Sequence, residues 1–356
     1  MGVVRIRKLT RTGAAVGATV AVTALFALWV SLGWGGPVVT SYVDDLVTVL
    51  AAASAVAAGA VAASRHRGEE RRFWAWMAAA CGAWTFAEVL WAVYDLSGNG
   101  KVPVPSWADV GYLAAIPLAA VALLAHPAVN AGSPRRARVF FDGLVVACAA
   151  LLVSWLTVLG PLWGRADLTT FGGIVAVAYP FGDVVLIVLV VLTARALPRG
   201  DRLPENAVLC GVVCMALSDS AYTYLTAVKS YSTGSWIDAG WVAAYLAFAV
   251  GAFAASGQRR ILLVTTRSTR PVTSLMAPYL VLLPALVVVT VEVSVGRPLN
   301  RLEWSLALTL ALLVVIRQSL FYRARIHHAG HQVSTPALPG GQIAPFGRAE
   351  ANGARR

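Results

Sequence analysis

Charged residues are scarce in this chain. Of its 356 residues, 13% are Asp, Glu, Lys or Arg, whereas 58% are apolar and the mean hydropathy is +0.70. Soluble domains carry about 25% charged residues, so a soluble enzyme is excluded. The high hydrophobicity also excludes a disordered chain. The sequence has no G-x-x-x-x-G-K-[ST], H-E-x-x-H or C-x-x-C motif, and it therefore shows no signature of nucleotide, metalloprotease or dithiol chemistry.

Cysteine and histidine, the usual ligands of transition metals, are also few, with four and five copies. The four cysteines all fall in apolar runs, and we interpret them as small buried apolar residues. Three histidines cluster as His-His-x-x-His at 327–331, a pattern that could hold a metal. A solvated basic strip near anionic lipid explains that cluster better, so we predict neither a metal nor a cofactor.

Long apolar runs dominate what remains. About 20 apolar residues cross a bilayer as a helix. Ten such runs fit the sequence, which predicts an all-α, polytopic integral membrane helical bundle of about ten transmembrane helices, built as two-span hairpins. Their expected positions are 14–34, 42–63, 73–96, 107–126, 139–162, 173–196, 207–228, 237–256, 275–295 and 303–322. This places a basic N-terminus at 1–13, a membrane domain at 14–322 and a disordered cytoplasmic tail at 323–356.

The net charge of +12 follows a strict pattern along the chain. With the N-terminus in the cytoplasm, 24 Lys and Arg residues fall on the inner side and five on the outer side. The positive-inside rule therefore predicts a multi-pass protein of the bacterial cell membrane with both termini cytoplasmic. The charge is a topology signal, so the expected partner is the lipid bilayer and no nucleic acid is expected.

An internal repeat lies beneath this pattern. Ser106–Ala114 and Ser235–Ala243 share the signature S-W-x-D-x-G-aromatic-aliphatic-Ala at a spacing of 129 residues. Shorter versions, Ser41–Asp44 and Asn300–Glu303, open two other even-numbered spans. Every copy opens its span at the predicted outer face, so the repeat is parallel. Ten-span transporters are commonly built from inverted halves, and the parallel repeat weakens a transporter interpretation without excluding it.

The signature has a structural and a functional interpretation. A Ser followed three residues later by an acid resembles a capping box, which satisfies free N–H groups at the start of a helix. The alternative is an outer vestibule whose acids attract cations. Both interpretations concern the same residues: Ser41, Asp44, Ser106, Asp109, Ser235 and Asp238.

Three further acids, Glu88, Asp183 and Asp219, lie well inside predicted spans. A charged carboxylate near the bilayer centre costs at least ~2.5–3.5 kcal/mol on insertion scales. These acids must therefore be protonated, hydrogen-bonded, or matched by a cation or ligand. One interpretation is hydrogen bonding that holds the helices together. The other is an outward-open ligand pocket, for which the candidate residues are Glu88, Asp183, Asp219, Trp91, Tyr94 and Tyr222.

Several segments resemble the amino-terminal membrane region of actinobacterial diguanylate cyclase/phosphodiesterase proteins. The similar segments are Glu88–Tyr94, Val104–Leu113, Ala178–Leu186, Leu217–Tyr222, Asp238–Tyr245 and the exit Val315–Gln318. The resemblance implies a sensory membrane module. It does not extend to the catalytic domains, because Gly340-Gly341 is followed by Gln342-Ile343 where that family has a Gly-Gly-Asp/Glu-Glu-Phe signature.

Three functions therefore stay open at this stage. The first is a non-enzymatic sensory or signalling module that acts through a separate signalling protein in the cytoplasm. The second is a ten-span transporter of a small solute. The third, an intramembrane enzyme, lacks an evident nucleophile–base pair or metal set, and we expect no enzymatic activity.

Overall fold

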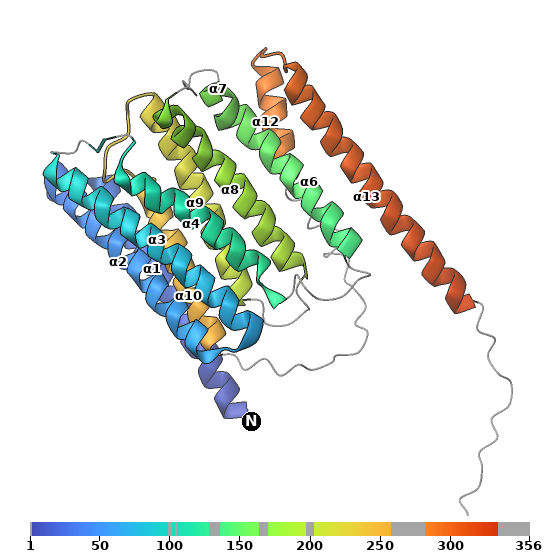
Figure 1. Ribbon diagram of the computed structural model, residues 1–356, viewed down its shortest axis with the longest axis horizontal. Coiled ribbons are helices and arrows are strands. Elements are labelled where there is room, and N and C mark those ends of the chain that lie inside the picture. The colour runs from blue at the N-terminus through green and yellow to red at the C-terminus, as the bar shows by residue number, and fades with distance from the viewer. Residues whose placement is uncertain are drawn as a thin grey trace, which may run out of the picture. The chain divides into compact units, whose positions relative to one another are not determined.

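The computed structural model describes residues 2–98, 102–103, 105–127, 136–163, 170–196, 203–257 and 282–333. These residues are helical apart from short turns and loops, and no strand occurs among them (Figure 1). The elements are α1 (Gly2–Leu32), α2 (Gly36–Arg65), α3 (Gly68–Ser97), α4 (Trp107–Leu124), α6 (Arg136–Ser154), η2 (Trp155–Leu159), α7 (Gly160–Trp163), α8 (Phe171–Ala196), α9 (Leu203–Ala227), α10 (Asp238–Ser256), α12 (Leu282–Ser294) and α13 (Arg301–Val333).

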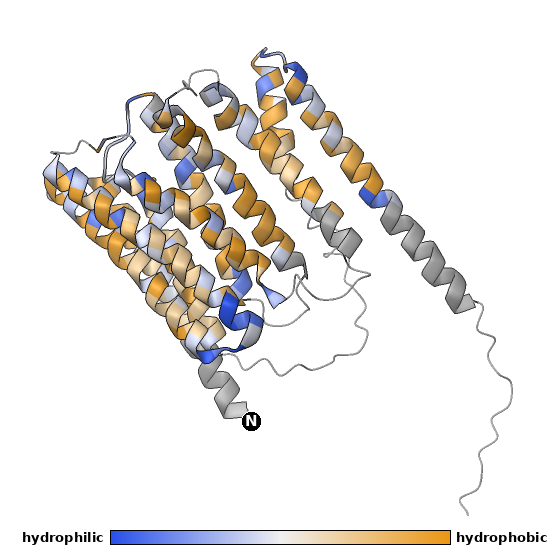
Figure 2. Ribbon diagram, in the orientation of Figure 1, coloured by the Kyte–Doolittle hydropathy of each residue, from blue (hydrophilic) through white to orange (hydrophobic). Residues whose placement is uncertain are grey.

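The predicted all-helical membrane architecture is confirmed. Eight of the described helices are long and apolar enough to cross a bilayer, and two shorter apolar helices, Gly143–Leu159 and Leu282–Ser294, fall in the other two predicted spans. Figure 2 shows apolar residues along most of the length of the helices. Large apolar side chains also face outward, among them Leu25, Leu50 and Phe86, which are 67%, 59% and 55% exposed. A soluble monomer rarely presents so much apolar surface, so this chain is a multi-pass membrane protein.

Two compact units divide the chain after Val314. In the first unit, six helices form a closed ring in the order α2, α3, α4, α8, α9 and α10, with α10 packed back against α2. Small residues allow this close packing: Ala52, Ala62 and Ala80 are fully buried. Helix α1 packs outside the ring on α10, and α6 packs outside it on α8. A separate apolar cluster joins α6 to α12 and to the first turns of α13.

Three expectations need correction. Helix α2 begins at Gly36 and not at residue 42, because Gly35 takes a φ of 88° and Pro37 is placed in the first turn, where proline favours a helix start. Residues 323–333 are not a disordered tail but continue α13 to Val333, since each residue added to an existing helix needs no new nucleus. The rest of the predicted tail, 334–356, lies outside the described residues. Cys81 and Cys148 are buried as expected, but Cys210 is exposed because it lies on the outer face of α9.

Candidate functional site

A cavity of about 250 Å³ lies inside the ring of six helices. Its walls come from one half of each helix: the beginnings of α2, α4, α8 and α10 and the ends of α3 and α9. Pro103, Ser106 and Tyr231 also line it, so the cavity reaches the loops at this end of the ring. We call these loops the mouth. The Arg-rich turn Arg65–Arg72 between α2 and α3 lies at the opposite end.

The cavity is acidic. Six carboxyl groups line it, and no Lys, Arg or His from the described part of the chain does so. The six are Asp44, Asp45, Glu88, Asp109, Asp183 and Asp219. Like charges in one apolar enclosure repel one another, and each also loses hydration by burial. The cavity is therefore built to receive positive charge, whether as protons or as a cation.

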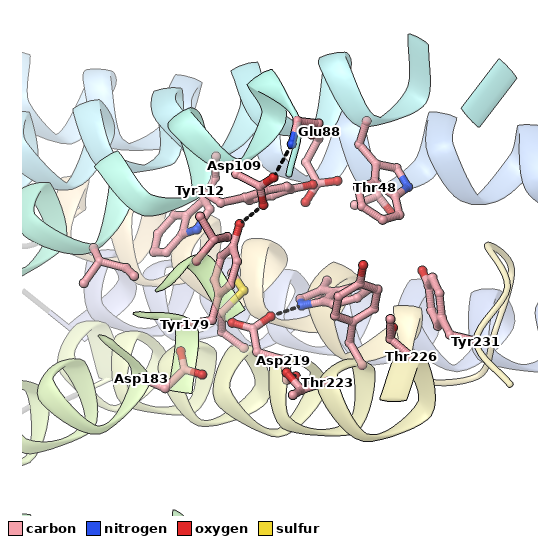
Figure 3. A pocket seen from close by; sticks show the side chains of 18 of the residues that line it. Thr48, Glu88, Asp109, Tyr112, Tyr179, Asp183, Asp219, Thr223, Thr226 and Tyr231 are labelled. Atoms are coloured by element: carbon pink, nitrogen blue, oxygen red, sulfur yellow. Dashed lines mark hydrogen bonds between the residues drawn. The ribbon is translucent and has the colours of Figure 1, made fainter. Parts of the chain in front are cut away.

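Eight aromatic side chains also line the cavity, and several of them hold the acids in place (Figure 3). The Trp241 Nε1–H donates to Asp219 at 2.7 Å, and the Tyr245 hydroxyl donates to Glu88 at 2.7 Å. The Tyr179 hydroxyl donates to Asp109 at 2.5 Å. The aromatic residues that line the cavity are Trp84, Trp91, Tyr112, Tyr179, Tyr222, Tyr231, Trp241 and Tyr245.

The sequence repeat has the same structural role in both copies. The aromatic of the signature is Tyr112 in the first copy and Trp241 in the second. Trp241 donates to Asp219 of the preceding helix, and Tyr112 lines the cavity together with Glu88 of the preceding helix. The ring therefore consists of two consecutive three-helix units, α2–α3–α4 and α8–α9–α10, and each contributes an acid and an aromatic at matching places to one cavity.

The glycine of the signature lets each pair of helices approach. A Cβ atom on Gly111 would lie 2.8 Å from the carbonyl oxygen of Ala83, on α3. A Cβ atom on Gly240 would collide with the Ser218 hydroxyl of α9, which donates to the Ile237 carbonyl at 2.9 Å. A residue with a side chain at position 111 would push α3 and α4 apart, whereas at position 240 the Ser218 hydroxyl would have to rotate and lose its hydrogen bond. The glycine thus places the aromatic that follows it within reach of the acid.

At α4 and α13 the signature residues cap the helix, as the structural interpretation predicts. Ser106 and Asp109 form a complete capping box at α4, in which the Ser106 N–H donates to Asp109 at 2.6 Å. Asn300 and Glu303 exchange hydrogen bonds of 2.8 and 2.9 Å at α13.

At α10 only the acid caps. Asp238 accepts from the N–H groups of Gly234 and Ser235 at 2.9 and 2.7 Å. The Ser235 side chain makes no cap at α10, where Ile237 is the residue before the first turn.

For Ser41 and Asp44 the capping prediction is wrong. Both lie inside α2, because that helix begins five residues before Ser41. The Ser41 hydroxyl instead donates to Asp95, at the end of α3, at 2.5 Å. The Thr233 hydroxyl donates to the other oxygen of Asp95 at 3.1 Å. Asp95 thus ties α2, α3 and the loop before α10 together at the mouth, and Asp44 is left free to line the cavity.

Tyr231 in the loop before α10 adds a polar group to the mouth. Its hydroxyl donates to Asp238 at 3.2 Å. Burial raises the pKa of Tyr231 well above its ordinary value, and the neighbouring carboxylates of Asp238 and Asp44 raise it further. The hydroxyl therefore keeps its proton and stays a hydrogen-bond donor across the physiological pH range.

Three buried carboxyl groups in the cavity wall keep an oxygen without a partner. Asp44, Asp45 and Asp183 are 5%, 6% and 8% exposed. Oδ1 of Asp44, Oδ2 of Asp45 and Oδ2 of Asp183 have no hydrogen-bond partner in the described structure. Unsatisfied buried acceptors cost about 1–3 kcal/mol each, more when charged, so a ligand or water that donates to them is favoured. Pro180 leaves a further acceptor, because it has no N–H for the carbonyl of Ala176, another lining residue.

The far side of the cavity is closed by packed side chains. Trp84 stacks on Phe248 with ring centroids 5.7 Å apart, and Tyr245 packs against Trp84. Below them the interior is filled by buried apolar residues such as Met77 and Ala252. The cavity is therefore a one-ended pocket in this conformation.

The structure brings together most of the residues singled out from the sequence. Glu88, Asp183, Asp219, Trp91 and Tyr222 line the cavity, and Asp44, Ser106 and Asp109 from the signature line it as well. The two groups were predicted separately, and they belong to one site. Tyr94 does not line the cavity, Ser41 acts through Asp95, and Ser235 and Asp238 belong to the loop and helix start beside the mouth.

Other lining residues were not predicted. No motif or repeat in the sequence pointed to Asp45, Thr48 or Tyr245. Asp45 nevertheless follows Asp44 directly, and Tyr245 lies one helical turn after Trp241. Tyr112 could have been found, because it occupies the same place in the repeat as Trp241. Among the described residues no group of three or more His, Cys, Asp or Glu is arranged to hold a metal ion.

Comparison with known proteins gives no match: no protein-family model, no curated protein and no solved structure is recognisably similar to this chain.

Proposed function

We propose that this chain is a sensory membrane protein that binds a small organic cation in the one-ended cavity. The observation that carries the proposal is the lining itself: six carboxyl groups and eight aromatic side chains, with no basic residue from the described part of the chain. Carboxylates neutralise a cation, and aromatic faces attract it through the ring quadrupole. An anion finds no basic side chain from the described part of the chain there.

The position of the cavity supports a role in sensing an external ligand. The mouth is the end that the charge asymmetry predicts to be outside, whereas the Arg-rich turn Arg65–Arg72 is predicted to be inside. Helix α13 continues as a helix to Val333, beyond its membrane-spanning part Arg301–Ser319. Such a helix suits contact with a separate cytoplasmic signalling protein, which agrees with the resemblance at Val315–Gln318.

The transporter alternative has less support. The packed layer formed by Trp84, Tyr245 and Phe248 blocks a route from the cavity to the other end of the ring. The parallel repeat also places both copies of the acid–aromatic pair on the same side of that layer. Transport would need a second conformation in which this layer opens.

Ligand binding tests the proposal directly. Tetramethylammonium and n-butylamine should each raise the Tm of the purified protein in detergent and change the fluorescence of the cavity tryptophans, whereas neutral n-butanol should do neither. A ligand at one hundred times its Kd stabilises by about 2.7 kcal/mol, which corresponds to a Tm increase of roughly 5–10 °C. Absence of any effect from both cations would refute the proposal.

Two amide variants and one control locate the binding. Glu88→Gln and Asp219→Asn keep the size of the side chains but remove negative charge, so both should weaken binding of the cations. Glu69→Gln, an exposed position at the opposite end of α3, should bind like the parent. Uptake of labelled butylamine into vesicles that contain the protein should equal uptake into empty vesicles. Uptake above that level would favour a transporter.

A further inference from the structure

Unpartnered carboxyl oxygens occur in both three-helix units, and their positions indicate the class of cation that the cavity takes. The unpartnered oxygen of Asp183 belongs to α8, in the second three-helix unit, and those of Asp44 and Asp45 belong to α2, which lies opposite α8 in the ring. Asp183 has Asp219 as its charged neighbour, within hydrogen-bond reach. The acids near Asp44 are Asp238, Asp45 and Glu88, and Glu88 is also near Asp219. The cavity therefore has free acceptors on two opposite helices, α8 and α2, which we call its two ends.

A single ammonium group serves one end only. Placed at Asp183, it leaves the carboxyl groups around Asp44 to be neutralised by protons, and the reverse placement leaves Asp183 and Asp219 to be neutralised in the same way. Burying an unmatched carboxylate is costly, whereas a charge-assisted hydrogen bond to each free oxygen is about twice as strong as a neutral one. Two positive charges on one molecule satisfy both ends at once.

The cavity wall also contains apolar side chains. Trp84, Ile116 and Leu186 are among the lining residues, and they offer a surface for methylene groups and not for further charge. At the ~30 Å³ that a water molecule occupies in the liquid, a volume of about 250 Å³ accommodates roughly eight non-hydrogen atoms. A short unbranched chain with an amine at each end fits this volume.

We infer that the natural ligand class is a linear aliphatic diamine, with one ammonium group at Asp183 and Asp219 and the other at Asp44. This inference rests on the proposed function, since it names the kind of organic cation that the cavity takes. Each ammonium group donates to the carboxyl groups at its end, and the methylene chain lies against the apolar part of the wall.

Matched ligands test the inference on the unaltered protein. In titration calorimetry of the purified chain, 1,4-diaminobutane should bind at least about tenfold more tightly than n-butylamine, because the second amine adds one charge-assisted hydrogen-bonded pair. The neutral analogue 1,4-butanediol should not bind. Equal affinity for diaminobutane and butylamine would overturn the inference and leave the proposed function intact, whereas binding of neither amine would overturn both.

Single variants then assign the two ends. Asp44→Asn and Asp183→Asn should each reduce the affinity for 1,4-diaminobutane about tenfold or more, towards that of n-butylamine, because each variant retains one acidic end. Each variant should affect the monoamine less than it affects the diamine. Glu69→Gln serves as the control and should change neither affinity. A variant that weakens the monoamine and the diamine by the same factor would show that the two amines do not use separate ends, and would refute the assignment.

Discussion

The glycine of the repeat provides a sharp test of how the cavity is built. In Gly111→Ala the new Cβ atom would lie 2.8 Å from the Ala83 carbonyl oxygen and 2.9 Å from the Ala87 Cβ atom. Both atoms belong to α3, and neither is the end of a flexible side chain, so α4 must move away from α3. Overpacking of this kind costs about 1–3 kcal/mol.

Alanine also has a favourable effect that must be subtracted. It is about 0.8–1.0 kcal/mol better than glycine in a helix interior. The net loss for Gly111→Ala is therefore roughly 0–2 kcal/mol, which lowers the Tm by up to about 8 °C at 2–4 °C per kcal/mol. Gly82→Ala is the matched control, since a Cβ atom there meets nothing within 4 Å. This control should keep the helix-propensity gain and match or exceed the parent Tm.

The assay is thermal unfolding of the detergent-solubilised protein, followed by tryptophan fluorescence, with cation affinity measured on the same samples. Gly111→Ala should lower both Tm and affinity, because displacing α4 draws Tyr112 away from Glu88. Gly240→Ala should have a smaller effect in the second copy, since its Cβ atom meets the Ser218 hydroxyl, which can rotate away at the cost of its hydrogen bond to the Ile237 carbonyl. If Gly111→Ala behaves like Gly82→Ala, the close approach of α3 and α4 does not organise the cavity and the reasoning is wrong.

Two further predictions concern the buried acid and the topology. Tyr245→Phe removes the hydrogen bond to the buried Glu88. It should destabilise the protein by about 1–3 kcal/mol and lower its Tm. The control is Tyr224→Phe, at a 61% exposed site, which should leave the Tm unchanged. Equal Tm values for the two variants would mean that the Glu88 contact does not contribute. Reporter fusions at Gly68 should be cytoplasmic and those at Ser232 external, and a reversed pair would contradict the orientation of the mouth.

The sequence predicted the helices well because hydropathy is a local property. Each span is a run of about 20 apolar residues, and its neighbours in the fold do not alter that length. The start of α2 was missed for a local reason too. Ser41 and Asp44 fit the spacing of a capping box, but Pro37 allows the helix to begin earlier, and the same spacing then falls on the helix interior. A capping pattern does not reveal on its own whether the helix has already started.

The site was predictable only in pieces. Hydropathy identified Glu88, Asp183 and Asp219 as acids inside spans, and the repeat identified Asp44 and Asp109, but no local pattern shows that these acids share a cavity. That depends on contacts between distant segments, above all the packing of α10 on α2, which closes the ring. Tyr245 illustrates the gap: it contacts Glu88, which lies 157 residues earlier in the chain.

The direction of the repeat explains why one cavity results. Inverted repeats place matching elements at opposite faces of the membrane, an arrangement that allows two gates to open in turn. Here the two signature glycines, Gly111 and Gly240, bring matching aromatics to the same end of the ring, and the other end is filled by apolar packing around Phe248. Duplication of a three-helix unit in parallel therefore doubles the polar groups at a single site. Two similar acid–aromatic pairs then face each other across one enclosed space, which suits a ligand with a charge at each end better than a solute that must leave on the far side.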